Sequence, residues 1–247
     1  MRILDAPPNA VILGLDLGQV SDYSALAVLE VQTTVGADAP VYAIRALDRW
    51  RPRRYQQVVE RVAEIVSRLT VAVPVSTPGG GLALVAPAVS LVVDRTGVGR
   101  AVGDMFSEAR LPVDLVLVSI HGGATISRDS DGGWATPKRD LAGVVAVALQ
   151  NNRLVIADRL EHAATLKAEL TNFRAKIGAN GHTRYEAGGD DWRQGNHDDL
   201  LLATSMAIWF GEQKRAPGRE MYSYSYLDDS PSDDDLGRGE WLARYAR

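Results

Sequence analysis

The residues best suited to chemistry in this sequence are aspartates that stand at the ends of apolar segments. Asp16 closes the run "AVILGLD" and Asp94 closes the run "VSLVVD". Asp198 and Asp199 stand directly before the apolar stretch "LLLATSMAIWF". A carboxylate in apolar surroundings is costly unless it is paired or bound to a cation. Because Mg²⁺ and Mn²⁺ prefer carboxylate oxygens, aspartates that converge from separate elements would make a site for divalent metal ions.

A site of this kind is suited to phosphodiester hydrolysis. Two ions about 4 Å apart can activate a water molecule and stabilise the leaving oxygen of a phosphodiester. A helix that begins at Asp198 or Asp199 would add the partial positive charge of its N-terminus. Asp22 lies six residues after Asp16 and could reach the same site from the start of the next strand. The aspartates therefore predict a nuclease-like metal centre.

Each aspartate also has an ordinary structural role available to it. Asp16 could be a strand-end residue with satisfied hydrogen bonds, Asp94 could cap the following turn, and Asp22 could be a turn residue. Aspartate is favoured at the N-cap and in the first turn of a helix, so Asp198 and Asp199 fit that role too. We expect one of these two residues to cap the helix and the other to bind metal, with Asp199 favoured as the direct ligand.

Apolar runs and helical spacing predict the elements that would position these residues. Strands are predicted over 10–18, 24–34, 41–50, 88–94, 112–120 and 153–157, and helices over 55–69, 99–109, 136–152, 162–178 and 197–210. The turn residues "VGADAP" between the second and third strands favour an antiparallel meander. Strands that then alternate with helices predict an α/β fold with a mixed sheet. Ligands bind beyond the strand ends of such sheets, which is where Asp16 and Asp94 stand.

Composition limits the class of protein. The chain has 247 residues, of which 46% are hydrophobic and 23% are charged, as expected for a soluble globular protein. It has no cysteine, which excludes disulfides and thiolate zinc sites. No apolar run approaches the roughly 18–20 residues of a membrane span, so no membrane partner is expected. The net charge of −4 gives no general nucleic-acid footprint, so local Lys and Arg clusters would have to bind DNA.

One main folded domain is predicted, from 11 to 214, after a short N-terminal extension at 1–10. The polar and acidic segment 215–247 is expected to be a mobile tail. Inside the domain, the Gly- and Pro-rich stretch "VPVSTPGGGLALVAP" is predicted to be a loop. The stretch "HGGATISRDSDGGW" is predicted to be a long polar loop, and loops of that length are usually functional or disordered.

Five segments, in order, resemble the C-terminal nuclease domain of phage large terminases. They are "ILGLDLGQVSDYSALAVLE", "LVVDRTGVGRAVGDMF", "TPKRDLAGVVAVALQNNRLVIA", "LKAELTNF" and "HDDLLLATSMAIW". The resemblance runs from about residue 11 to about residue 211, and the last segment is the most specific. It implies an RNase H-like (RuvC-type) fold, with an antiparallel first part of the sheet and helices on both faces.

The resemblance also implies roles for individual residues. It makes Asp16, Asp94, Asp198 and Asp199 the catalytic residues that hold two Mg²⁺ or Mn²⁺ ions. Asp22 matches a further acidic metal ligand that some members of the family carry. For His197, a place at the surface, or behind a metal ligand to which it hydrogen bonds, is expected.

The activity implied is cleavage of double-stranded DNA with little sequence preference during genome packaging, in the cytoplasm of the host cell. Large terminases also carry an ATPase domain with a phosphate loop, and no G-x-x-x-x-G-K-[ST] motif occurs here. We therefore expect either an excised domain or a nuclease that works with a separate packaging ATPase. A small terminase or portal protein is a further partner that the family suggests.

DNA contact is expected from basic residues near the strand ends. The candidates are Arg95, Arg100, Arg128, Lys138, Arg139, Arg174, Lys176 and Arg184. Each of them alone fits a solvated surface charge, whereas together they could bind phosphates with strong salt dependence. The loop 121–134 and the hairpin 181–186 are the segments expected to face DNA.

Other functions fit parts of the sequence. The segment "GLDLGQVSDYSALAVLE" also resembles the first phosphate loop of actin/sugar-kinase-like ATPases, but a second Gly-rich phosphate hairpin is not convincing here. A Holliday-junction resolvase of the RuvC type would share the fold and the acidic residues. A catalytically silent interaction module is a third alternative, and the full set of aspartates argues against it.

Overall fold

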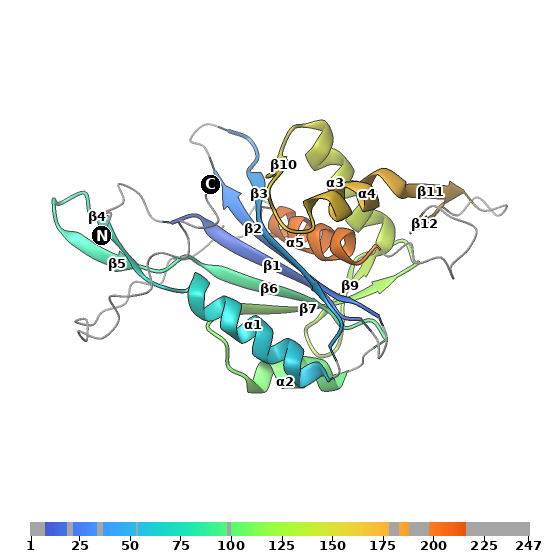
Figure 1. Ribbon diagram of the computed structural model, residues 1–247, viewed down its shortest axis with the longest axis horizontal. Helices are drawn as coiled ribbons and strands as arrows, with labels where there is room; N and C mark the ends of the chain where they lie inside the picture. The colour runs from blue at the N-terminus through green and yellow to red at the C-terminus, as the bar shows by residue number, and fades with distance from the viewer. Residues whose placement is uncertain are drawn as a thin grey trace.

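The computed structural model describes residues 8–18, 22–33, 37–52, 54–97, 100–177, 183–187 and 198–215. Its centre is an eight-stranded mixed sheet with helices on both faces (Figure 1). The sheet contains β1 (Ala10–Asp16), β2 (Ser24–Gln32), β3 (Val41–Trp50), β6 (Val89–Asp94), β7 (Asp114–His121), β8 (Ser127–Arg128), β9 (Trp134–Pro137) and β10 (Leu154–Ile156). The helices are α1 (Tyr55–Leu69), α2 (Arg100–Glu108), α3 (Lys138–Gln150), α4 (Ala163–Asn172) and α5 (Asp199–Arg215).

The strand order in the sheet is β10-β3-β2-β1-β6-β7-β9-β8. β1, β2 and β3 pair antiparallel, which confirms the predicted meander. β1 pairs with β6 in parallel, and the register matches Leu15 with Val93. Asp16 and Asp94 each follow the matched residue, so the two aspartates end neighbouring strands at the same edge of the sheet.

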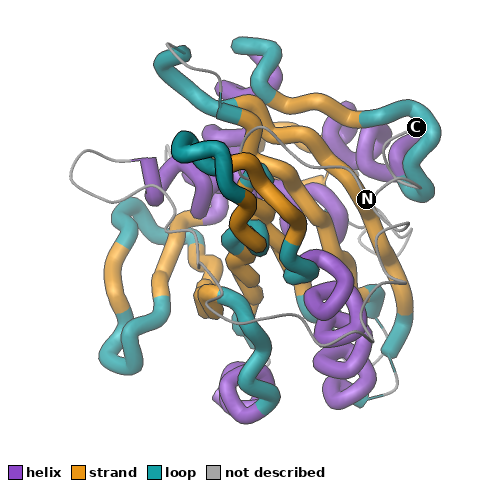
Figure 2. The backbone as a smooth tube through the Cα atoms, turned by 90° about the vertical axis from the view of Figure 1, so that its left-hand side faces the viewer, coloured by secondary structure: helices purple, strands orange, loops and turns teal. Residues whose placement is uncertain are grey.

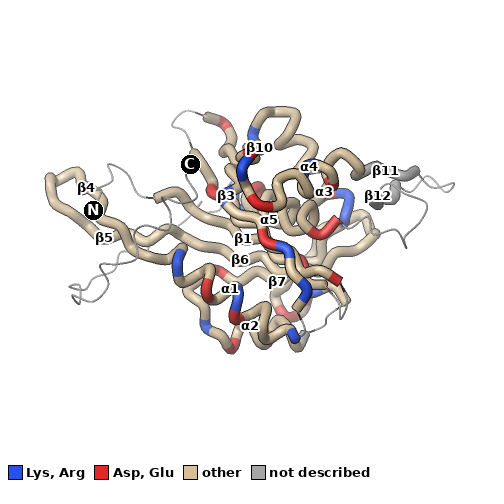
Figure 3. The backbone as a smooth tube through the Cα atoms, viewed as in Figure 1, with Lys and Arg blue, Asp and Glu red and all other residues tan. Residues whose placement is uncertain are grey.

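Two hydrophobic cores hold this sheet between its helices. α1 and α2 cover one face with residues such as Val62 and Phe106, and α3, α4 and α5 cover the other with residues such as Leu141, Leu166 and Met206. Figure 2, turned by 90°, shows the strands with helices on either side. In Figure 3, β1 and β6 carry no charged position over most of their length, as expected of strands buried on both faces.

α5 packs very closely on β1, because β1 has a glycine at the crossing point. A Cβ atom on Gly14 would lie 1.9 Å from the backbone oxygen of Ala203. Any other residue at position 14 would therefore push α5 away from the strand. This close packing sets how far the first turn of α5 lies from the end of β1.

Three segments differ from their predicted structure, and one of them is the predicted loop 121–134, which contains β8 paired antiparallel with β9. The stretch "VPVSTPGGGLALVAP" is not a loop but contains a hairpin of β4 (Val73–Ser76) and β5 (Leu82–Val85), which projects from the main body in Figure 1. The predicted helix 162–178 ends at Asn172, and the chain continues as β11 (Phe173–Ile177), paired with β12 (Thr183–Ala187). Apolar and basic residues alternate in "FRAKI", which is a strand pattern, and the ladder with β12 satisfies its backbone.

Helix boundaries shift as well. The helix predicted to begin at residue 136 begins at Lys138, because Thr136 and Pro137 end β9 and Pro137 is the N-cap. α5 begins at Asp199 and extends to Arg215, beyond the predicted end at 210. Residues 1–7 and 216–247, most of the predicted extension and tail, lie outside the described residues. Within the described part, no helix is long and apolar enough to cross a membrane.

Candidate metal-binding site

The ends of β1 and β6 bury two neighbouring carboxylates. Asp16 is 9% exposed and Asp94 is 7% exposed. Burial raises the pKa of Asp16 well above its usual range, and the negative charges of Asp94, Asp199 and Asp198 raise it further. The positive charge of Lys138 acts in the opposite direction. The four predicted catalytic aspartates therefore share one electrostatic environment, although they come from distant parts of the chain. Asp16, Asp94, Asp198 and Asp199 are called the acidic cluster below.

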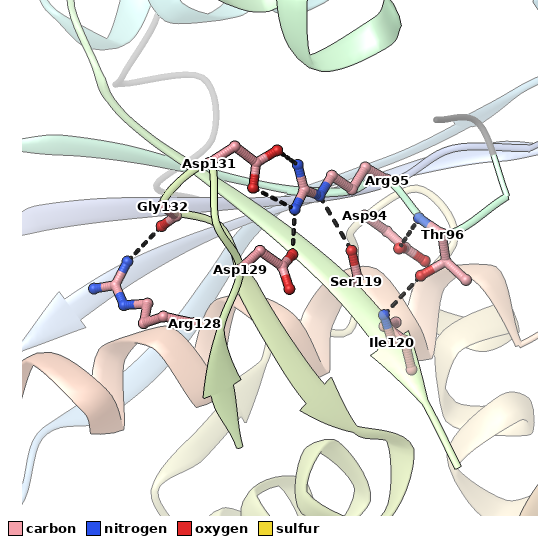
Figure 4. A network of polar contacts seen from close by, with 9 residues as sticks. All are labelled: Asp94, Arg95, Thr96, Ser119, Ile120, Arg128, Asp129, Asp131 and Gly132. Atoms are coloured by element: carbon pink, nitrogen blue, oxygen red, sulfur yellow. Dashed lines mark hydrogen bonds and ion pairs between the residues drawn. The ribbon is translucent and has the colours of Figure 1, made fainter. Parts of the chain in front are cut away.

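Asp94 is held by the turn that follows β6. The backbone N–H of Thr96 donates to Asp94 Oδ1 at 2.7 Å, and the N–H of Ile120 in β7 donates to Thr96 Oγ1 at 2.7 Å (Figure 4). Burial raises the pKa of Asp94, while hydrogen bonds from Thr96 and the charge of Lys138 reduce the increase. Asp94 thus caps the turn, as one alternative predicted, and its side chain also belongs to the buried acidic group.

The start of α5 brings in the other two aspartates, and each is paired with a basic residue. Lys138, at the start of α3, donates from Nζ to Asp198 Oδ2 at 2.8 Å. Arg49, near the end of β3, donates from Nη2 and Nε to Asp199 Oδ2 at 3.0 and 3.1 Å. These contacts offset the negative charge of the cluster. Lys138 was predicted as a DNA contact, whereas Arg49 was not predicted at all.

Glu169 in α4 is a further acidic residue that the sequence did not single out. It is 9% exposed, and its Oε2 accepts a hydrogen bond from the backbone N–H of Leu201 at 2.8 Å. Burial raises the pKa of Glu169 to about 7; the charges of Asp199 and Asp198 add to the rise, and the Leu201 hydrogen bond opposes it. A signal was present in the sequence, because Glu169 falls at helical spacing from Leu166 on the buried side of α4.

Two further residues were predicted at the site, Asp22 as a metal ligand and His197 as a residue behind a ligand. Asp22 is described and exposed, in a bend before β2. His197 lies outside the described residues. Among the residues that the structure describes, no three His, Asp or Glu side chains form a group that could hold a metal ion. Asp198 and Asp199 instead direct Oδ2 atoms to Lys138 and Arg49.

The chemistry of the donors nevertheless fits a divalent cation. Mg²⁺ and Mn²⁺ take carboxylate oxygens, and the acidic cluster offers them from two strand ends and one helix start. The negative charge that raises the pKa of Asp16 is the charge that a cation would offset. Asp198 and Asp199 would have to share their oxygens with the ion or turn from their basic partners to bind it.

The predicted DNA contacts separate into internal and surface groups. Arg95 is 9% exposed at its side chain and pairs with Asp129 and Asp131, and it also donates to Ser119 (Figure 4). These contacts tie the β8–β9 turn to the residue after Asp94. Arg95 therefore acts inside the protein, which its position in the sequence did not reveal.

Arg128 and Arg139 lie nearer to solvent. The guanidinium of Arg128 stacks over the ring of Trp134 at 3.6 Å and donates to the backbone oxygen of Gly132 at 2.7 Å. Arg139 donates to the backbone oxygen of Ala124. Arg100 begins α2, Arg174 and Lys176 lie in β11, and Arg184 lies in β12; their side chains are outside the described part of the structure.

Comparisons with solved structures identify the fold. The chain is similar to the large terminase nuclease from thermophilic phage G20c with bound magnesium, at 19% identity and a TM-score of 0.53, over 83% of this chain and 84% of that one. It is also similar to mutant forms of the Sf6 phage large terminase nuclease domain. Each of these, one with calcium and one with manganese, has 12% identity and a TM-score of 0.54, over 82% of this chain and 89% of that one.

No protein-family model and no curated protein matched the sequence. At these identities the structural likeness establishes the fold alone. It confirms the predicted RNase H-like (RuvC-type) architecture, with its mixed sheet, antiparallel start and helices on both faces.

Proposed function

We propose that this chain is a metal-dependent endonuclease that hydrolyses double-stranded DNA, of the kind used in phage genome packaging. The observation that carries the proposal is the buried Asp16, whose ionisation is opposed by burial and by three further aspartates, Asp94, Asp198 and Asp199. A cation bound among these carboxylates would offset their negative charge and favour the ionised form of Asp16. The similar structures named with magnesium or manganese support the choice of metal.

Asp16, Asp94, Asp199 and Asp198 are the residues that would hold two Mg²⁺ or Mn²⁺ ions. When bound, such ions supply an activated water and stabilise the leaving oxygen of the scissile phosphodiester. Thr96 fixes the direction of the Asp94 carboxylate, and Arg49 fixes that of Asp199. These contacts would hold the two carboxylates in place before metal binds, and the ion would then share the Asp199 oxygens with Arg49 or displace that contact.

Lys138 has a second role in this proposal. Its ammonium group lies beside the acidic cluster and lowers the pKa of Asp16 and Asp94 against the effect of burial. A positive group there would also attract a DNA phosphate toward the site. Asp22 stays in the proposal as an additional metal ligand. His197 stays in it as a residue that would orient a ligand.

Double-stranded DNA would be bound by basic residues around the site. Arg128 and Arg139 are the contacts for which the structure describes a surface position, and Arg100, Arg174, Lys176 and Arg184 complete the proposed set. A separate packaging ATPase, with a small terminase or portal protein, would be the protein partners. The nuclease domain would span 11–214, between the extension 1–10 and the acidic tail 215–247.

Cleavage of supercoiled plasmid tests the activity. The wild-type chain should nick and linearise plasmid with Mg²⁺ or Mn²⁺, and Asp16→Asn should lower the rate by at least about a hundredfold. Asp158→Asn is a matched control, because Asp158 pairs with Lys167 far from the acidic cluster in sequence and is strongly exposed. Equal cleavage by Asp16→Asn and wild type would refute the assignment.

Two further substrates separate the alternatives. A four-way DNA junction cut in strong preference to linear duplex would indicate a resolvase. ATP hydrolysis without DNA cleavage would indicate the actin/sugar-kinase-like alternative. The packaging-type nuclease should cut linear duplex as readily as branched DNA and should leave ATP intact.

A further inference from the structure

The first turn of α5 is capped by a side chain from another helix. The first backbone N–H groups of a helix have no acceptor inside the helix. In α5 the N–H of Leu202 already donates to the backbone oxygen of Asp198 at 2.8 Å. The N–H of Leu201, one residue earlier, donates to Glu169 Oε2 of α4, also at 2.8 Å. Glu169 thus takes the place that an N-cap side chain usually fills.

This arrangement releases Asp198 from capping. Asp198 precedes α5, where the side chain of an aspartate ordinarily accepts a hydrogen bond from the helix N–H two or three residues later. Here Asp198 Oδ2 accepts from Lys138 Nζ, and Glu169 accepts from the Leu201 N–H. The Leu201 N–H therefore does not need the Asp198 carboxylate, which pairs with the same Lys138 whose charge acts on Asp16 and Asp94.

Packing alone does not explain a glutamate at this position. Glu169 is 9% exposed, and its Oε1 is buried without a hydrogen-bond partner among the described residues. A buried oxygen without a partner is costly, and an apolar side chain of similar size would avoid that cost. The contact with Leu201 is the described interaction that a carboxylate, and not a leucine, provides there.

We propose that Glu169 is a positioning residue for the metal site, acting through the backbone of Leu201. By holding the first turn of α5, it fixes Asp198 and Asp199 relative to the strand ends that carry Asp16 and Asp94. The inference rests on the proposed metal-dependent function. Its structural half, the capping of α5, is measurable without any metal.

The test compares Glu169→Ala with Glu169→Gln. Glutamine keeps the shape and one oxygen acceptor, whereas alanine removes the acceptor. In Glu169→Ala, hydrogen exchange at the Leu201 amide should rise about fivefold to tenfold relative to the Met206 amide in the middle of the same helix. Mn²⁺ affinity of the folded protein should fall about tenfold or more, as for residues that orient metal ligands from behind. Glu169→Gln should stay within about threefold of wild type in both measurements.

Glu212→Ala is the matched control. Glu212 lies in the same helix and accepts hydrogen bonds from Tyr42 and Arg153, at the end remote in sequence from the acidic cluster. Its loss should destabilise the fold while leaving the exchange ratio of Leu201 to Met206 and the Mn²⁺ affinity unchanged. This control separates a general loss of stability from a loss of positioning.

Each other outcome overturns part of the proposal. Unchanged Leu201 exchange in Glu169→Ala would overturn the capping role. Faster exchange with unchanged Mn²⁺ affinity would overturn the positioning role. An equal loss of Mn²⁺ affinity in Glu169→Gln and Glu169→Ala would show that the charge of Glu169, and not its hydrogen bond to Leu201, supports metal binding. A wild-type chain that binds no Mn²⁺ would refute the proposed metal site, and Leu201 exchange would still decide whether Glu169 caps α5.

Discussion

Arg49 of β3 donates two hydrogen bonds to a single oxygen, Oδ2, of Asp199 at the start of α5. The two residues are 150 positions apart in the chain. The guanidinium of Arg49 also lies 4.0 Å from the centre of the Tyr23 ring. Arg49 therefore links the antiparallel meander to α5 and fixes one carboxylate of the proposed metal site.

Arg49→Ala should lower the free energy of unfolding by about 2–3 kcal/mol, because it leaves the largely buried Asp199 carboxylate without this cation. Chemical denaturation near neutral pH measures the change. Arg49→Lys keeps the charge but not the two-donor geometry, and its free energy of unfolding should fall by less than that of Arg49→Ala. A loss below about 0.5 kcal/mol in Arg49→Ala would show that the pair does not stabilise the fold.

Asp16→Asn should stabilise the metal-free protein. Burial and the neighbouring aspartates raise the pKa of Asp16, so its ionisation near neutral pH opposes folding. Removing the charge should increase the free energy of unfolding in the presence of a chelator. Mn²⁺ should then raise the melting temperature of wild type but not that of Asp16→Asn. A variant that is less stable than wild type without metal would contradict the electrostatic picture.

Glu212 gives the fold a defined pH dependence. Burial alone would raise its pKa, but hydrogen bonds from Arg153 and Tyr42, with the charges of Arg153 and Arg215, outweigh burial and lower it. The stabilisation is therefore present above the usual glutamate pKa and is lost as the pH falls through the lower value in the folded protein. Glu212→Gln should cost about 1 kcal/mol near neutral pH and almost nothing once the pH is below the lowered pKa of Glu212 in the folded protein. A cost that does not change over this range would exclude the ion pair as its source.

Arg128 and Arg95 should respond differently to removal. Arg128→Ala should weaken duplex DNA binding and reduce the slope of log affinity against log salt by about 1, as expected for a lost phosphate contact. Arg95→Ala should instead lower stability by about 2 kcal/mol, because Asp129 and Asp131 lose their buried partner. Binding measured at several salt concentrations, together with denaturation curves, distinguishes the two effects. The reverse assignment would follow if Arg95→Ala alone changed the salt slope.

Much of the fold could be predicted because its signals are local. The apolar runs that end in Asp16 and Asp94 predicted β1 and β6, and the turn residues after β2 predicted the meander. β11 was missed because "LKAELTNFRAKIG" carries a helical pattern in its first part and a strand pattern in its last. Short patterns of that kind are decided by pairing with β12, which local sequence does not show.

In the candidate site, the four aspartates were the residues predicted from the sequence as metal ligands. Their types and strand-end positions point to metal chemistry without knowledge of their partners. Arg49 and Glu169 were missed because their importance lies in contacts with Asp199 and Leu201, which the chain brings together only on folding. For Arg95 the sequence suggested the wrong kind of contact. Its position next to Asp94 suggested DNA binding, whereas in the structure Arg95 pairs with Asp129 and Asp131.

Mn²⁺ binding measured by titration calorimetry tests the proposed metal centre most directly. The wild-type chain should bind Mn²⁺ at the acidic cluster, with two ions per chain when the site is saturated. Asp16→Asn should lose most of this binding, and Asp158→Asn should keep it. An absence of binding by the wild-type chain, or equal binding by Asp16→Asn, would contradict the assignment of these aspartates as metal ligands.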